Sequence, residues 1–159
     1  MRQILPVFLA LALAASAAAQ GQDEPFINDL SSPTRVIVSL YNAINRHEYL
    51  RAWSYFKAGA VPPYEQFRAG YARTGKVELR IGEVRSEGAA GSIHSAVPVA
   101  LRARDADGAE TVFTGCYLLT EVQPAMQETP PFRPIRIDGG KLAKSRSPFE
   151  EATGQCEEP

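Results

Sequence analysis

Histidine, methionine, cysteine and tryptophan are scarce in this 159-residue chain, which holds two, two, two and one of them. The histidines and cysteines, His47, His94, Cys116 and Cys156, lie at unrelated positions without the ligand spacing of a zinc site. We therefore expect no metal and no cofactor. Few side chains titrate near neutral pH, so candidates for acid–base catalysis are few as well.

A surplus of positive charge is also missing. The chain has 17 basic and 18 acidic residues, and they are interspersed without a basic stripe. A nucleic-acid surface needs such a stripe, and a helix that lies on an anionic membrane needs clustered lysine and arginine. We therefore expect neither nucleic acid nor a membrane surface among the partners.

The only long apolar run, ILPVFLALALAA, follows Arg2 and precedes three alanines at positions 17–19. Spanning a bilayer takes about 20 apolar residues, so this run is short for a membrane anchor. A basic residue, an apolar run and small residues in this order are typical of a cleaved export signal. We predict that residues 1–19 are a signal peptide and that the protein is exported, to the periplasm or outside the cell.

The rest of the chain is long enough for one domain with its own core. Its polar start, residues 20–32, is predicted to be a flexible tether. A single α+β domain is expected over residues 33–146, followed by a polar C-terminal tail over 147–159.

Two cysteines in an exported domain pair most simply with each other. A bond between Cys116 and Cys156 would close a loop of about 41 residues and, by loss of chain entropy, stabilise the fold by roughly 4 kcal/mol. It would also hold the C-terminal tail on the domain. Two free thiols or an intermolecular bridge are the alternatives.

The first half of the domain has the apolar spacing of helices. Ser32 and Pro33 suit a helix start, and the stripe that follows runs to about Asn45. Further stripes begin at Tyr49 and Tyr64. The sequence therefore predicts three short amphipathic helices.

After Gly75 the apolar period changes from 3.6 to 2, which indicates strands. Four strands are predicted, at residues 77–84, 93–101, 111–122 and 135–144, with a bulge at Gly82 in the first and a hairpin turn at residues 105–108. Helices followed by antiparallel strands are the order of an α+β fold with helices on one face of the sheet.

The segments VIVSLYNAINRHEYLRAWSYF, YEQFRAGYART and FTGCYLL resemble the nuclear transport factor two-like superfamily, which includes SnoaL-like cyclases and ketosteroid isomerase. Many relatives have Asn-Arg-Gly-Asp-Tyr between their first two helices, and this chain has Asn45-Arg46-His47-Glu48-Tyr49 there. The resemblance covers roughly residues 33–145. It implies a cone-shaped α+β domain, with three helices packed on a curved antiparallel sheet of about four strands.

The same resemblance bears on His47 and Glu48, which by themselves look like a catalytic pair. If His47 stands where relatives have glycine, it takes the left-handed conformation after the first helix. Glu48 then begins the second helix, where a carboxylate is favoured. We expect these two residues to form the joint between helices and to take no part in chemistry.

Enzymes of this superfamily work in a cavity between sheet and helices, and the resemblance places aromatic side chains there. Tyr41, Trp53, Tyr71 and Tyr117 are the residues expected to bind a ligand. No aspartate falls on a stripe that faces this cavity. His94, inside the second predicted strand, is the one remaining candidate for a catalytic base.

The sequence thus favours a non-catalytic, exported binding or accessory module. Its cavity or sheet face would bind a small apolar ligand, a component of the cell envelope or a protein partner. A homodimer formed through the sheet face is a further expectation. The alternative is a small lyase, isomerase or cyclase of the SnoaL or ketosteroid isomerase type, with His94 or a tyrosine as proton carrier.

Overall fold

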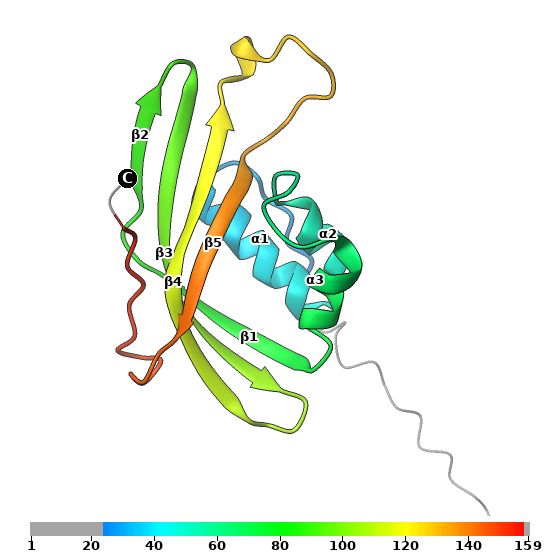
Figure 1. Cartoon of the computed structure of the whole chain (residues 1–159), viewed down its shortest axis with the longest axis vertical. Coiled ribbons are helices and arrows are strands. Elements are labelled where there is room, and N and C mark those ends of the chain that lie inside the picture. The colour runs from blue at the N-terminus through cyan, green and yellow to red at the C-terminus, as the bar shows by residue number, and fades with distance from the viewer. Residues whose placement is uncertain (1–23, 158–159) are drawn as a thin grey trace, which may run out of the picture.

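The computed structural model describes residues 24–157 and shows three helices packed on one face of a five-stranded antiparallel sheet (Figure 1). The strands follow the order β1-β3-β4-β5, and β2 also pairs with β3. The expected α+β class is therefore confirmed. The predicted signal peptide lies outside the described residues. The elements are α1 (Pro33–Asn45), α2 (Tyr49–Ser54), α3 (Tyr64–Gly70), β1 (Thr74–Ile81), β2 (Arg85–Ala89), β3 (Ser92–Asp105), β4 (Glu110–Val122), a short 3-10 turn (Pro124–Met126) and β5 (Arg136–Lys144).

Helix α1 begins as its sequence predicts. The hydroxyl of Ser32 accepts a hydrogen bond from the backbone N–H of Arg35, and Pro33 occupies the first turn. At the other end, the Asn45 side chain donates to the carbonyl of Val77 and accepts from its N–H, at 2.9 and 2.7 Å. These two bonds fix the end of α1 to strand β1.

The sheet has five strands where the sequence predicted about four. The segment expected to run as one strand to Val84 ends at Ile81, and a separate strand, β2, begins at Arg85. Both pair with the same side of the long strand β3, with Ile81 opposite Val99 and Arg85 opposite Ala96. Pro98 lies between these pairs, where its missing N–H costs no ladder bond because neither strand continues there.

The core lies between the helices and the sheet. It contains one face of α1 together with alternate residues of β3, β4 and β5. Gly140 on β5 is required there, because a Cβ at this position would overlap the ring of Tyr117. The largest fully buried apolar side chains are Ile37, Leu40, Ile44, Leu119, Ile137, Val36, Val97 and Val99.

Part of the segment expected to be a flexible tether, residues 20–32, is hydrogen-bonded to α1. The backbone N–H groups of Ile27 and Asp29 donate to side chains of α1, Asn42 Oδ1 at 2.9 Å and Ser39 Oγ at 2.8 Å. Asn42 and Ser39 are buried polar residues. Because buried polar groups need partners, they hold this segment against the helix, and Arg51 adds a hydrogen bond to the carbonyl of Ile27.

The C-terminal residues 147–157, here called the strap, run along the sheet on the side opposite to the helices (Figure 1). Phe149 and Ala152 pack against Ala100 of β3, and the guanidinium of Arg102 lies 4.7 Å from the Phe149 ring centre. The expected disulfide, Cys116 to Cys156, is present and joins the strap to β4. The strap therefore covers part of the sheet face.

Within residues 24–157, no helix has the length and apolar character needed to cross a bilayer.

Candidate functional site

The helix side of the sheet holds two of the tyrosines expected to bind a ligand. Tyr41 on α1 and Tyr117 on β4 are each 4% exposed, and their hydroxyl oxygens are 2.7 Å apart. Burial raises the pKa of both phenols well above the usual range. Each hydroxyl has the other as partner, so a ligand would have to break this bond to reach either one.

The other two expected ligand residues lie nearer the rim of the same layer. Tyr71 stacks on Tyr49, with ring centres 6.1 Å apart, and burial raises its pKa too. The indole N–H of Trp53 donates to the carbonyl of Pro62 at 3.1 Å. Tyr71 and Trp53 thus pack against the core. Ligand binding by this set of four remains a prediction.

His47 and Glu48 form a joint, as expected. His47 has a φ of 58°, in the left-handed region, directly after α1. Glu48 accepts hydrogen bonds from Arg46 at 2.8 Å and Arg51 at 2.6 Å. Partial burial opposes ionisation, but the two guanidinium groups prevail and hold the pKa of Glu48 below its usual value. The carboxylate connects the end of α1 to α2. Both of its oxygens accept hydrogen bonds from arginine, which does not suit a catalytic base.

The opposite face of the sheet carries an open hollow. Leu118 on β4 is 52% exposed on this face, and the strap residues Cys156 and Glu157 line the hollow beside it. An open groove of about 810 Å³ lies here, within the usual size range of small-molecule sites. Called the strap-side groove below, it is lined by Arg85, Glu87, Gly88, His94, Ser95, Ala96, Leu118, Leu119, Asp138, Cys156 and Glu157.

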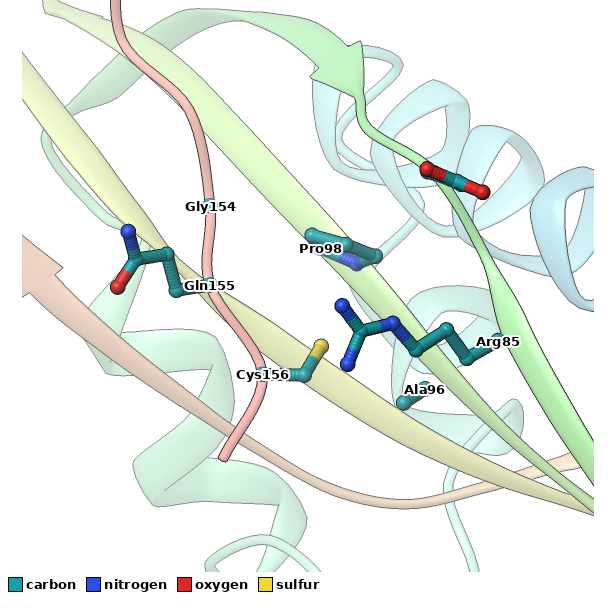
Figure 2. A pocket seen from close by; sticks show the side chains of 7 residues that line it. Arg85, Ala96, Pro98, Gly154, Gln155 and Cys156 are labelled. Atoms are coloured by element: carbon teal, nitrogen blue, oxygen red, sulfur yellow. The ribbon is translucent and has the colours of Figure 1, made fainter. Parts of the chain in front are cut away.

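A second hollow of about 330 Å³ adjoins the strap-side groove and shares Arg85, Ala96 and Cys156 with it. Figure 2 shows the Arg85 side chain extending from β2 over the sheet toward the strap beside Cys156. Pro98 forms part of the floor. The disulfide-bonded end of the strap therefore shapes both hollows.

His94 lies in the strap-side groove, on the face away from the helices. Its neighbour on β4 is Thr120, and Nδ1 of His94 is 3.0 Å from the Thr120 hydroxyl oxygen. That hydroxyl in turn donates to Asp138 Oδ2. His94, Thr120 and Asp138 thus form a hydrogen-bonded chain across three strands.

A β-bulge brings Asp138 into this chain. Leu118 pairs with Gly139 while Leu119 pairs with Ile137, so Asp138 is the extra residue of β5. Bulges often re-aim a side chain in this way. The other carboxylate oxygen, Oδ1, lies 3.5 Å from Lys57 Nζ, an ion-pair distance without hydrogen-bond geometry.

The sequence singled out His94 and missed the rest of this site. Alternation along the second strand placed His94 on the side of Ala96, Pro98 and Arg102, and this is the side the structure gives to the groove. Asp138 looked like a strand end, because a bulge leaves no clear mark in a sequence that also bends at two glycines. Exposed Leu118 sits in a strand that is apolar on both faces, so nothing set it apart.

In residues 24–157 no group of three or more histidine, cysteine, aspartate or glutamate side chains is arranged to hold a metal ion.

No protein-family model matches this sequence, and comparison with curated proteins finds no match. Among solved structures, Aln2 from a Streptomyces species is similar over 73% of this chain and 94% of its own, with 14% identity and a TM-score of 0.46. A chain of the C. albicans Mtr2–Mex67 M domain complex is similar over 79% and 88%, with 12% identity and a TM-score of 0.40. These likenesses concern the overall fold and do not extend to a ligand or an activity.

Proposed function

We propose that this protein is an exported, non-catalytic binding module that takes a small, largely apolar ligand in the strap-side groove. The observation that carries the proposal is the contrast between the two faces of the sheet. On the helix side, Tyr41 and Tyr117 close on each other in the core. On the strap side, an open groove leaves the apolar side chain of Leu118 half in solvent.

Catalysis of the ketosteroid isomerase kind finds less support. That chemistry needs a proton carrier in the cavity between sheet and helices, and His94 lies on the other face. Apart from the tyrosines, the buried polar residues of the described chain are Ser39, Asn42 and Ser95, which do not titrate. Binding is therefore the better reading of this geometry.

The exported location is part of the proposal. It is supported by the pattern of residues 1–19 and by the bond between Cys116 and Cys156, because disulfides persist mainly in oxidising compartments. Intact mass measurement of protein recovered from its own cell envelope should give a chain that starts at Gln20 and lacks two thiol hydrogens. A full-length chain with two alkylatable thiols would overturn this part.

Binding can be tested with Nile red, a neutral apolar dye, by its fluorescence on addition of the mature protein. We expect Leu118→Asn to weaken dye binding by about tenfold, the effect of losing roughly 1.4 kcal/mol of apolar contact. Leu142→Asn is the matched control, because Leu142 on β5 is 39% exposed but is not among the residues that line the groove. Equal effects of the two substitutions, or no binding by the unaltered protein, would overturn the proposal.

The predicted homodimer through the sheet face would have to use the part that the strap leaves uncovered. We propose that the dimer contact includes the strap-side groove, so a dimer and a bound ligand would compete for it. Gel filtration with and without the dye would detect such competition as a shift from dimer to monomer.

A further inference from the structure

We propose that the strap-side groove selects aliphatic alcohols by a hydrogen bond to His94 Nε2, and that protonation of His94 reverses this preference toward anionic amphiphiles. The inference deepens the proposed binding function and rests on it.

The direction of the hydrogen bonds at Thr120 determines which ring nitrogen of neutral His94 carries the hydrogen. A threonine hydroxyl has one hydrogen, and an ionised carboxylate can only accept. Since the Thr120 hydroxyl donates to Asp138 Oδ2, its contact of 3.0 Å with His94 Nδ1 requires the ring N–H to be the donor. In the neutral ring the hydrogen is therefore on Nδ1, and Nε2 is an acceptor.

Nε2 is the ring nitrogen available to a ligand. His94 lines the groove, and among the described residues its one hydrogen bond is the one that Nδ1 makes to Thr120. A series of contacts fixes the orientation of the ring, as hydrogen-bond partners do for metal-binding histidines. Lys57 forms an ion pair with Asp138, Asp138 accepts a hydrogen bond from Thr120, and Thr120 accepts one from the ring. The hydroxyl group of an alcohol placed at Nε2 would donate a hydrogen bond to it and extend the hydrogen-bonded series of His94, Thr120 and Asp138.

The apolar part of the ligand has a place beside this acceptor. Leu118 and Thr120 lie two residues apart on the same face of β4, a spacing of about 7 Å along a strand. Ala96 is opposite Leu118 on β3, so the two form an apolar floor next to the histidine. A short alkyl chain would therefore lie over Leu118 with its hydroxyl at Nε2.

The charges around His94 disfavour an anionic head while the ring is neutral. Glu87 of β2 is the cross-strand neighbour of His94, and Asp138 lies behind Thr120. Glu157, at the end of the strap, pairs with Lys141 at 3.2 Å. Arg85, a cation that also lines the groove, has interactions of its own. When the ring takes up a proton, Nε2 becomes a donor and the ring a cation, so an anionic head then gains a hydrogen bond and an ion pair.

The test uses two probes with the same hydrocarbon, 1-octanol and 1-octanesulfonate, added to the mature protein in calorimetric titrations. Each titration is run at a pH of about 8 and at a pH of about 5.5, the range in which a histidine side chain can change its charge. We expect 1-octanol to bind about tenfold more tightly than 1-octanesulfonate at the higher pH, the worth of one hydrogen bond. At the lower pH the ratio should fall by at least tenfold or reverse.

The two histidines of the chain provide a matched control. His94→Gln keeps a polar side chain that does not titrate, so the change of preference with pH should disappear, whereas His47→Gln should retain it. Thr120→Val keeps the shape of Thr120 but leaves the ring without its orienting partner, so the preference for 1-octanol at high pH should shrink.

The outcomes separate this inference from the proposed function. Binding of both probes with equal affinity at both pH values, still weakened by Leu118→Asn, would overturn the inference and leave the binding function standing. A change with pH that persists in His94→Gln or disappears in His47→Gln would also overturn it. Absence of binding by either probe, together with no binding of Nile red, would overturn both.

Discussion

The hydroxyl groups of Tyr41 and Tyr117 are hydrogen-bonded at 2.7 Å although the residues lie 76 positions apart in the chain. The bond connects α1 to β4 through the middle of the domain, and the two rings meet edge to face with centres 6.4 Å apart. Inside a protein such a bond is stronger than in water, and losing one partner is more costly than losing both. The pair therefore links the helix layer to the sheet inside the core.

Replacing one member of this pair leaves a buried hydroxyl without a partner. Tyr41→Phe and Tyr117→Phe should each lower the free energy of unfolding by about 1–3 kcal/mol. The double variant leaves nothing unsatisfied, so its loss should be smaller than the sum of the two single losses, as measured by urea unfolding. Additive losses would show that the hydroxyls do not depend on each other.

The same tyrosines predict how stability changes in alkaline solution. Burial raises the pKa of Tyr41 and Tyr117, whereas in the unfolded chain both ionise near pH 10. Their contribution is therefore fully present below about pH 10 and is lost as the pH rises further, because only the unfolded state then releases protons. Urea unfolding across this range should show a steep fall in stability, accompanied by late appearance of tyrosinate absorbance. The stability of the Tyr41→Phe, Tyr117→Phe double variant should fall less steeply with pH. An identical fall in stability would contradict the assignment to these two tyrosines.

Gly154 allows the strap to lie directly on the sheet. A Cβ at this position would overlap backbone atoms of Val99 and Gly115, and backbone cannot move aside as a flexible side chain does. Gly154→Ala should therefore cost about 1–3 kcal/mol and expose the Cys116–Cys156 bond to faster reduction by dithiothreitol. Gly70→Ala is the control, since no atom lies within 4 Å of the Cβ it would add, and it should be neutral or stabilising by about 0.5–1 kcal/mol. Similar effects of both changes would mean that the strap is not seated as described.

His47 occupies a position that suits glycine better. Its φ of 58° is in the left-handed region, which costs most side chains about 1–2 kcal/mol. His47→Gly removes this strain but adds chain entropy to the unfolded state, so we expect a net gain of about 0.5–1 kcal/mol. His47→Ala keeps the strain and should give no gain. Thermal unfolding of both variants checks this, and a loss of stability in His47→Gly would show that the contact of the histidine ring with Tyr49 matters more than the backbone.

Local features of the fold were predictable because each has a local cause. Ser32 and Pro33 start a helix through their own backbone preferences, and the change of apolar period after Gly75 marks the move from helices to strands. The left-handed turn at His47 also follows from local rules once the resemblance aligns it with a glycine. The sequence indicated a break at Gly82 but read it as a bulge, and the separate strand β2 was missed because it depends on the length of β3, a neighbour distant in sequence.

The arrangement of the candidate site could not be predicted, because it depends on contacts between segments that are distant in sequence. Alternation separated His94 from Val97 and Val99, but it could not tell which of the two faces the helices would cover. The order of residues gave no sign that a bulge would place Asp138 behind Thr120. The docking of residues 24–31 likewise depended on Ser39 and Asn42 being buried, which is a property of the folded helix layer.

The sequence by itself therefore determined the class of fold, the positions of most helices and strands and the pairing of Cys116 with Cys156, since periodicity, capping and cysteine number act within short segments or in pairs. Tertiary structure alone decided that Tyr41 and Tyr117 satisfy each other, and that Leu118 and His94 line one groove beside Cys156. The physical reason is that burial and hydrogen-bond partnership arise only when distant segments meet, and a small difference in register decides which side chains then face solvent.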